Sequence, residues 1–293
     1  MAKPAGSASR VAVAKTYKIY IDGKFPRTES GRYFALEDKD GNVIANVSRS
    51  SRKDFRNAVV AARNALAGWS DASAYLRGQI LYRNAEMLEG RREQFIAELS
   101  AQGVARRKAA AEVDASIDRL IYYAGWADKY QQIFSAVNPV SSSHFNFSVL
   151  EPTGVVAIIA PEESGLLGLI SNIMPAVVGG NTCVVLASES LPLSAVSFAE
   201  VLHASDVPGG VVNILTGYRK ELTGQFASHM DVNAIVYTEA DPEVVRTVQV
   251  EAAQNIKRVI GRAGTKWEAE SSQNPYLIQD TQETKTTWHP IGG

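Results

Sequence analysis

The second half of the sequence alternates short apolar runs with segments of helical length, and this alternation constrains the fold most strongly. The run VVAII at residues 155–159 is continuously apolar, as expected for a strand covered on both faces. The same pattern predicts strands at 183–186, 211–215 and 235–237, and helices at 165–178, 194–203, 220–228 and 243–254. Strands that alternate with helices of this length predict an α/β fold with a parallel, doubly wound sheet.

The first half of the sequence predicts a different organisation, in which a small amount of β-structure precedes several helices. Residues 17–25 (YKIYIDGKF) alternate apolar with polar side chains and reach an Asp-Gly turn, which predicts a strand entering a hairpin. Helices are predicted from Ser50-Ser51 to Gly68, from Ser73 to Gly90, over 95–99 and over 106–134. The charges of the last of these helices alternate in sign, which predicts a solvated face.

Composition excludes several classes of partner and compartment. The 293 residues contain 30 Lys and Arg against 31 Asp and Glu, so no net field attracts nucleic acid or an anionic membrane. The longest apolar stretch, 165–180, contains Ser171, Asn172 and Pro175 and predicts a buried helix, not a membrane span. The sequence contains a single cysteine, and residues 1–16 resemble a mobile arm rather than a signal peptide. Both features favour a cytoplasmic protein.

No constellation of metal ligands or nucleophiles is evident in the sequence. The histidines are scattered, which predicts no metal site; they are His144, His203, His229 and His289. P-loop, Gly-x-Gly-x-x-Gly and Gly-x-Ser-x-Gly patterns are absent. The adjacent carboxylates Glu162-Glu163 are candidates for acid/base chemistry, but we expect strand-end carboxylates to be solvated.

An ordered set of segments between residues 17 and 258 resembles the aldehyde dehydrogenase superfamily. These segments are YIDGKF, RNAVVAARNALAGWS, YRNAEML, EPTGVVAIIAP, PAVVGGNTCVVLASESLPL, DVPGGVVNILTG and DVNAIVYT. The resemblance implies a Rossmann-like domain of the nicotinamide-cofactor type with a β-hairpin flap that mediates oligomerisation. The expected organisation is an N-terminal arm (1–16), a helical and β part of the cofactor-type domain (17–134), the flap (135–150), a Rossmann-like domain (151–267) and a C-terminal loop with an edge strand (268–293).

Positions that bind substrate or cofactor in this family carry unsuitable residues here. Glu163 stands where the resemblance implies an Asn that donates to the oxyanion, and an ionised carboxylate cannot donate. Leu186 stands where the resemblance implies a Lys that binds the adenosine ribose together with a Glu. Glu189 matches that Glu, but we interpret it as a loop or capping residue. Glu239 and Ala240 replace a Gly-Ser pair that lets backbone N–H groups reach the pyrophosphate. We therefore expect no catalytic and no cofactor-binding residue, and NAD is a disfavoured ligand.

The end of the sequence departs from the family as well. Arg262-Ala263-Gly264-Thr265 aligns with a Glu-Leu-Gly-Gly segment that would carry the general base, and only residues 266–293 follow. We therefore expect the catalytic domain with its Cys nucleophile to be missing. Cys183 lies inside a predicted strand, where a free cysteine packs as a small hydrophobe. The closest resemblance is to the second, Cys-less unit of tandem aldehyde dehydrogenases.

These features predict a catalytically inactive homologue that serves as an assembly or regulatory module. It would form a homo-oligomer, or a hetero-oligomer with an active aldehyde dehydrogenase, through the strand at 145–150 and the segment 284–293. One alternative is an NAD-binding regulatory protein, which Glu189 and the order of the strands suggest. A second alternative, an NAD(P)-dependent aldehyde oxidoreductase, would require Cys183 as the nucleophile.

Overall fold

The centre of the molecule is a parallel sheet of five strands. The computed structural model describes residues 13–292. The strand order is β10-β9-β6-β7-β8, and every neighbouring pair is parallel. The strands are β6 (Val155–Ile159), β7 (Thr182–Leu186), β8 (Val212–Leu215), β9 (Ala234–Tyr237) and β10 (Arg258–Gly261). The chain runs outward from β6 to β8 and then continues on the other side of β6, which confirms the predicted Rossmann-like α/β fold.

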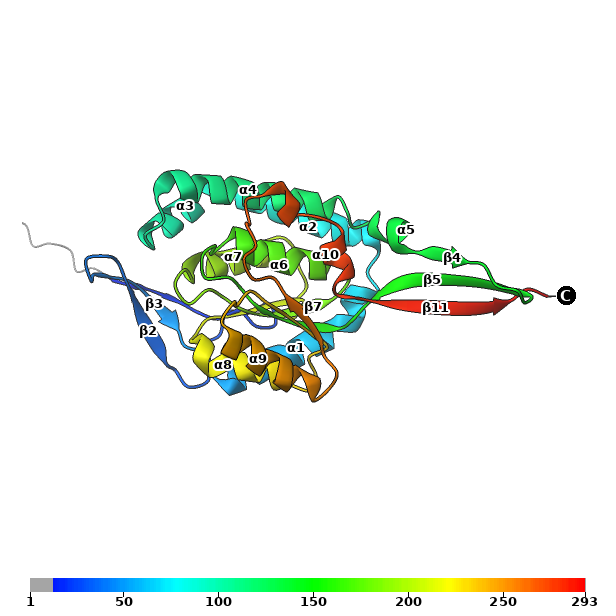
Figure 1. The fold of residues 1–293 in the computed structure, drawn as a ribbon. Helices are drawn as coiled ribbons and strands as arrows, with labels where there is room; N and C mark the ends of the chain where they lie inside the picture. The colour runs from blue at the N-terminus through cyan, green and yellow to red at the C-terminus, as the bar shows by residue number, and fades with distance from the viewer. Residues whose placement is uncertain (1–12, 293) are drawn as a thin grey trace, which may run out of the picture.

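Helices cover both faces of this sheet (Figure 1). On one face lie α6 (Leu167–Val178) and α7 (Leu193–Ala204), and on the other lie α1 (Arg52–Ser70), α8 (Arg219–Ser228) and α9 (Pro242–Ala253). Successive strand residues point into two separate cores: Val156 and Cys183 belong to the first, and Val155 and Val184 to the second. All residues of β6 and β7 are buried, which is why their sequences are continuously apolar.

A further helical layer packs over α6 and α7. It consists of α2 (Ala74–Glu89), α3 (Arg92–Ala101), α4 (Arg106–Ala124) and α5 (Tyr130–Phe134). The prediction of one helix over 106–134 was wrong, because the backbone N–H groups of Trp126, Ala127 and Lys129 donate to the carbonyl three residues back and separate α4 from α5. The predicted solvated face of this segment was also wrong at Glu112 and Arg119, which are buried.

A small sheet forms one end of the molecule. It contains β1 (Lys15–Tyr17), β3 (Val43–Ser48) and β2 (Tyr33–Glu37) in that order. The predicted strand over 17–25 was only partly correct, because β1 ends at Tyr17 and Tyr20 forms an isolated bridge to Ile214 of β8. The predicted Asp-Gly turn is present, and both of its residues have positive φ, as a tight hairpin turn requires. Residues 1–12 of the predicted N-terminal arm lie outside the described residues.

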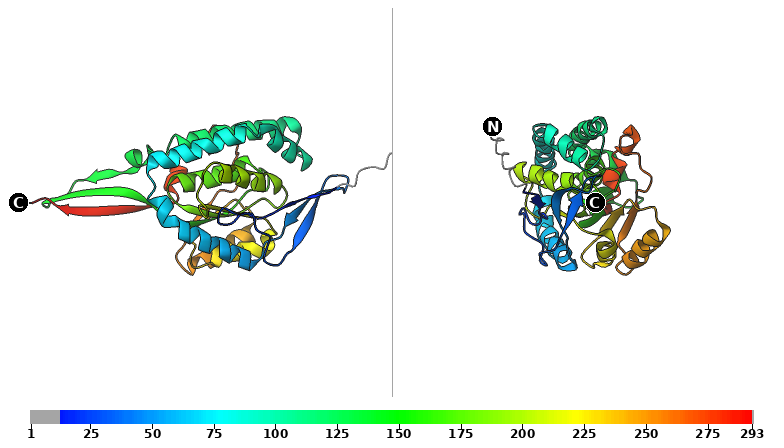
Figure 2. Two further views of the ribbon diagram at one scale, coloured as in Figure 1. Left: turned by 180° about the vertical axis from the view of Figure 1, so that it is seen from behind. Right: turned by 90° about the vertical axis from the view of Figure 1, so that its left-hand side faces the viewer.

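A three-stranded antiparallel arm projects from the opposite end (Figures 1 and 2). It contains β4 (Ala136–Asn138), β5 (His144–Pro152) and β11 (Gln282–Pro290) in the order β11-β5-β4. All nine residues of β11 pair with β5, which confirms the strands predicted at 145–150 and near the end of the sequence. Because β5 leads directly into β6, the arm lies at the amino ends of the parallel strands. Their carboxyl ends therefore face away from the arm.

The C-terminal segment returns from β10 to the arm across α6. It contains the short helices η1 (Glu270–Ser272) and α10 (Tyr276–Gln279), and α10 packs on α6. Among residues 13–292, no helix has the length and apolar character needed to cross a membrane. Within the same range, the structure brings together no group of three or more His, Cys, Asp or Glu side chains that could hold a metal ion.

Candidate functional site

The carboxyl edge of the sheet is the place at which this architecture binds ligands. In open parallel α/β sheets the crevice lies where the strand order reverses, and here that point is between β6 and β9. The segments that follow the strands meet at this edge, and they include Glu162 and Glu163 after β6, Glu189 after β7, Arg219 after β8 and Glu239 after β9. These residues decide what the crevice can hold.

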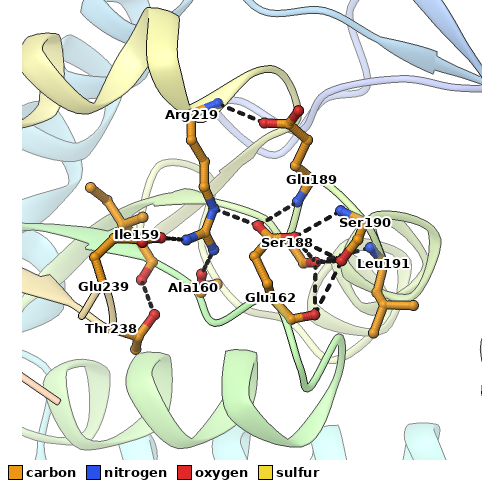
Figure 3. A network of polar contacts seen from close by, with 10 residues as sticks. All are labelled: Ile159, Ala160, Glu162, Ser188, Glu189, Ser190, Leu191, Arg219, Thr238 and Glu239. Carbon is orange, nitrogen blue, oxygen red and sulfur yellow. Dashed lines mark hydrogen bonds and ion pairs between the residues drawn. The ribbon is translucent and has the colours of Figure 1, made fainter. Parts of the chain in front are cut away.

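The side chain of Arg219 occupies the crevice (Figure 3). Arg219 is the first residue of α8, and its side chain is only 14% exposed. The guanidinium forms ion pairs with Glu162 and Glu239 and donates a hydrogen bond to the carbonyl of Ala160. Because Ala160 follows β6 and Glu239 follows β9, the guanidinium spans the point at which the strand order reverses. A cation of the chain itself therefore fills the position of the expected ligand.

Glu162 is the centre of the hydrogen bonds on the other side of Arg219. Its carboxylate accepts from the backbone N–H of Glu189 at 2.8 Å and of Ser190 at 2.9 Å, and from the hydroxyl of Ser188 at 3.0 Å. Burial raises the pKa of Glu162, but these hydrogen bonds and the charge of Arg219 outweigh burial, and the pKa lies below its ordinary value. The expectation that this carboxylate is solvated was only partly correct, because the side chain is 36% exposed while its oxygens accept hydrogen bonds from the loop after β7.

Two further predicted site residues lie in the same cluster. The carboxylate of Glu189 accepts the backbone N–H of Arg219 at 3.0 Å, so Glu189 caps the start of α8 as interpreted from the sequence. Glu239 pairs with Arg219, and the adjacent Ala240 is exposed. Arg219 thus joins the two positions that the family resemblance assigns to ribose and pyrophosphate binding.

The other predicted positions lie outside this cluster. Leu186 is completely buried in the core between the sheet and the helices α1 and α8, so nothing at this position reaches the crevice. Glu163 is exposed, and its carboxylate accepts the indole N–H of Trp267 at 2.9 Å. Trp267 itself is buried.

Helix N-termini at this edge carry carboxylates of the chain itself. At α9, Asp241 accepts the N–H groups of Glu243 and Val244 at 2.9 and 3.5 Å. At α6, the buried Glu112 accepts the N–H groups of Leu166 and Leu167 at 2.9 and 3.1 Å. Glu189 acts in the same way at α8. A helix N-terminus binds phosphate through such free N–H groups, and here the donors are already satisfied.

The charge of the crevice also opposes an anionic ligand. The single positive charge of Arg219 is surrounded by the carboxylates of Glu162, Glu189 and Glu239, so the negative charges of this cluster outnumber the positive one. Like charges at contact distance repel with about 1 kcal/mol in water and with several times that value near a protein surface. The pyrophosphate of a dinucleotide would therefore meet repulsion at the site where its binding requires attraction.

The environment of Cys183 is unsuited to a catalytic nucleophile. It occupies the middle of β7, is completely buried, and its N–H donates to the carbonyl of Val211 at 2.8 Å. Burial raises the pKa of its thiol well above the ordinary value, so the thiolate does not form at neutral pH. The prediction that Cys183 packs as a small hydrophobe is confirmed.

Arg219 and Glu112 are central to this edge, yet neither was identified from the sequence. Arg219 looks like an ordinary charge at the start of a helix, and Glu112 like one of many charges on α4. The available signal was indirect: four carboxylates at the ends of converging strands require a cation nearby. The structure shows which residue supplies it.

The sheet, its strand order and the crevice at its carboxyl edge define an α/β domain of the dinucleotide-binding class. Residues 26–269 match the family described as "Aldehyde dehydrogenase family". The chain therefore belongs to the aldehyde dehydrogenase family.

Individual relatives agree with this assignment. The chain is 34% identical to aldehyde dehydrogenase, cytosolic 1, of Elephantulus edwardii, over 85% of this chain and 50% of that protein. It is 30% identical to the cytosolic 10-formyltetrahydrofolate dehydrogenase of Mus musculus, over 89% of this chain and 30% of that protein. The NAD+ complex of the aldehyde dehydrogenase from Bacillus cereus has a TM-score of 0.81 at 27% identity, over 86% of this chain and 51% of that structure. The chain thus spans about half the length of these relatives, or less.

Proposed function

We propose that this chain is a catalytically inactive member of the aldehyde dehydrogenase family that acts as an assembly or regulatory module. The observation that carries this proposal is the ion-pair cluster of Arg219 with Glu162 and Glu239 at the switch point of the sheet. The charged groups of this cluster form ion pairs with one another, and the carboxylates outnumber the cation. Among family members, we infer the closest relationship to the Cys-less second unit of tandem aldehyde dehydrogenases.

The arm supplies a surface suited to assembly. The outer edge of β11 has no neighbouring strand among the described residues, and such edges add strands from other chains. Val137, Phe145 and Phe147 lie on one face of the arm around a cleft of about 310 Å³. Val137 is 68% exposed and Phe145 is 44% exposed. We propose that this face and edge bind a second copy of the chain or an active aldehyde dehydrogenase.

Sedimentation velocity at micromolar concentration tests the assembly role. The wild-type chain is expected to sediment as an oligomer, alone or mixed with an active aldehyde dehydrogenase, and Val137→Asp is expected to reduce this association. Val60→Asp is a matched control, because Val60 is 50% exposed on α1, away from the arm. A chain that stays monomeric alone and in every such mixture would contradict the proposed role.

A nucleotide-binding regulatory role is the second candidate. It is favoured by the similarity to a family member solved with NAD+ and by the position of Glu189 at the end of β7. Calorimetric titration with NAD and NADP separates the two candidates, because the filled crevice predicts no micromolar binding. NADH formation from a panel of aldehydes, compared between the wild type and Cys183→Ala, tests the remaining alternative of an active oxidoreductase.

A further inference from the structure

A second polar site lies away from the crevice, beneath the C-terminal segment. A cavity of about 400 Å³ is enclosed by residues 262–277, which cross α6 after the end of β10. Its wall contains both apolar and polar residues, and the polar ones include Arg262, Lys266, Ser272 and Asn274. Its volume lies within the range of small-molecule sites.

Arg262 is the buried cation of this cavity. Its side chain is only 7% exposed, and the guanidinium donates to the side-chain oxygen of Asn172 at 3.1 Å and to Asp280 at 3.4 Å. The Nε atom is buried and has no acceptor among the described residues. Arginine stays charged in proteins, and a buried charge normally has all its donors satisfied. One donor of Arg262 is therefore unpaired within residues 13–292.

A second buried guanidinium contacts the backbone of residues that line this cavity. Arg119 of α4 donates to the carbonyls of Trp267 at 2.9 Å and Ser272 at 3.1 Å, and to the side-chain oxygen of Gln273 at 3.0 Å. All of its partners in the described part of the chain are uncharged. Asp280 pairs with Arg262 and not with Arg119, so the charge of Arg119 has no ion-pair partner within the described residues.

An unpartnered hydroxyl lies beside these two charges. Tyr123 is completely buried, and its phenol oxygen lies near the backbone N–H of Asn274 without a well-formed hydrogen bond to any of residues 13–292. The charges of both Arg119 and Arg262 act on this phenol. Leaving a buried polar group unpaired costs about 1–3 kcal/mol, so this group also favours an additional partner.

We infer that this cavity binds a small oxyanion, a carboxylate or a phosphate group, with Arg262 as its principal ligand. The unpaired Nε–H of this guanidinium is a charged donor of the kind that carboxylate and phosphate oxygens accept. Lys266 lies exposed at the rim and adds a second positive charge. Asp280 is bonded to Arg262 and Glu163 to the indole N–H of Trp267, while Glu268 and Glu270 of the same segment are exposed. The site is distinct from the crevice, and it does not depend on whether the chain is an enzyme.

Calorimetric titration of the full chain with inorganic phosphate, and separately with succinate, tests the site at constant ionic strength. Saturable binding of at least one of these anions is expected. Arg262→Gln should abolish it, and Lys266→Glu should weaken it about tenfold, because it reverses a charge at the rim. Lys18→Ala is the control, since Lys18 is an exposed lysine near the N-terminal sheet, and it should leave binding unchanged.

The two probes also distinguish the sources of the oxyanion. Binding of phosphate alone assigns the site to phosphorylated ligands, and binding of succinate alone assigns it to carboxylates. Lys266 is exposed, so Lys266→Glu should fold normally. Its effect on anion binding therefore tests the site even if Arg262→Gln unfolds. The proposal is overturned if neither anion binds the wild type, or if binding persists unchanged in Lys266→Glu and in any folded Arg262→Gln protein.

Discussion

Replacing Arg219 by Gln tests the energetic role of the ion-pair cluster. The substitution removes the only cation shared by Glu162 and Glu239, whose side chains are 36% and 24% exposed. Removing one partner of a fully buried pair costs about 3–5 kcal/mol. Because water reaches both carboxylates in part, we expect a loss of about 2–3 kcal/mol in the free energy of unfolding. The melting temperature should fall by about 5–10 °C, at about 2–4 °C per kcal/mol for a chain of this size.

Urea denaturation followed by circular dichroism measures this loss, and Arg49→Gln provides a matched control. Arg49 pairs with Glu221 alone, and their side chains are 28% and 30% exposed. A surface pair of this kind contributes about 0–1 kcal/mol. Arg219→Gln should therefore be clearly more destabilising than Arg49→Gln.

The pH dependence of the free energy of unfolding, compared between the wild type and Arg219→Gln, supplies an independent check. The pKa of Glu162 in the folded chain lies below its ordinary value, so its stabilising contribution is present above the unfolded pKa. That contribution is lost as the pH falls through the folded pKa. In Arg219→Gln the unpaired carboxylates gain from protonation, so the gap between the two proteins should narrow from pH 7 to about pH 4. Equal stability at pH 7, or a gap that does not change with pH, would refute the reasoning.

Three further outcomes are expected. In Cys183→Ala we expect a loss of about 1 kcal/mol, and in the wild type a thiol that reacts with Ellman's reagent only after unfolding, because Cys183 is completely buried. Glu112→Ala should lower the free energy of unfolding in urea by about 3 kcal/mol, since two N–H groups of α6 lose their acceptor; a loss below that of Arg49→Gln would contradict this. Phe145→Asp should reduce self-association in sedimentation without lowering the melting temperature, because Phe145 lies on the exposed arm.

The central sheet could be predicted because its signals are local. The strands β6 and β7 are buried on both faces and therefore read as unbroken apolar runs. Helix starts were equally clear, since the side chains of Ser51, Ser73 and Asp241 each accept a backbone N–H at a helix N-terminus. The resemblance to aldehyde dehydrogenases rested on these same segments.

The features that escaped prediction depend on contacts between distant segments. Strand β10 lies at the sheet edge with half-buried residues, so its sequence lacks a continuous apolar run. The turn between α4 and α5 lies close to Gly78 of α2, where an added Cβ would meet the carbonyl of Ala124 at 3.2 Å, and a contact between such distant segments leaves no pattern along the chain. Arg219 finds its partners Glu162 and Glu239 on separate loops, and no pattern along the chain indicates such a pairing.

Calorimetric titration of the wild-type chain with NAD tests most directly whether its own ion pairs close the dinucleotide crevice. The cluster around Arg219 predicts no saturable heat at NAD concentrations up to about 1 mM, which corresponds to a binding free energy weaker than about −4 kcal/mol. Micromolar binding of NAD to the wild-type chain would contradict this account.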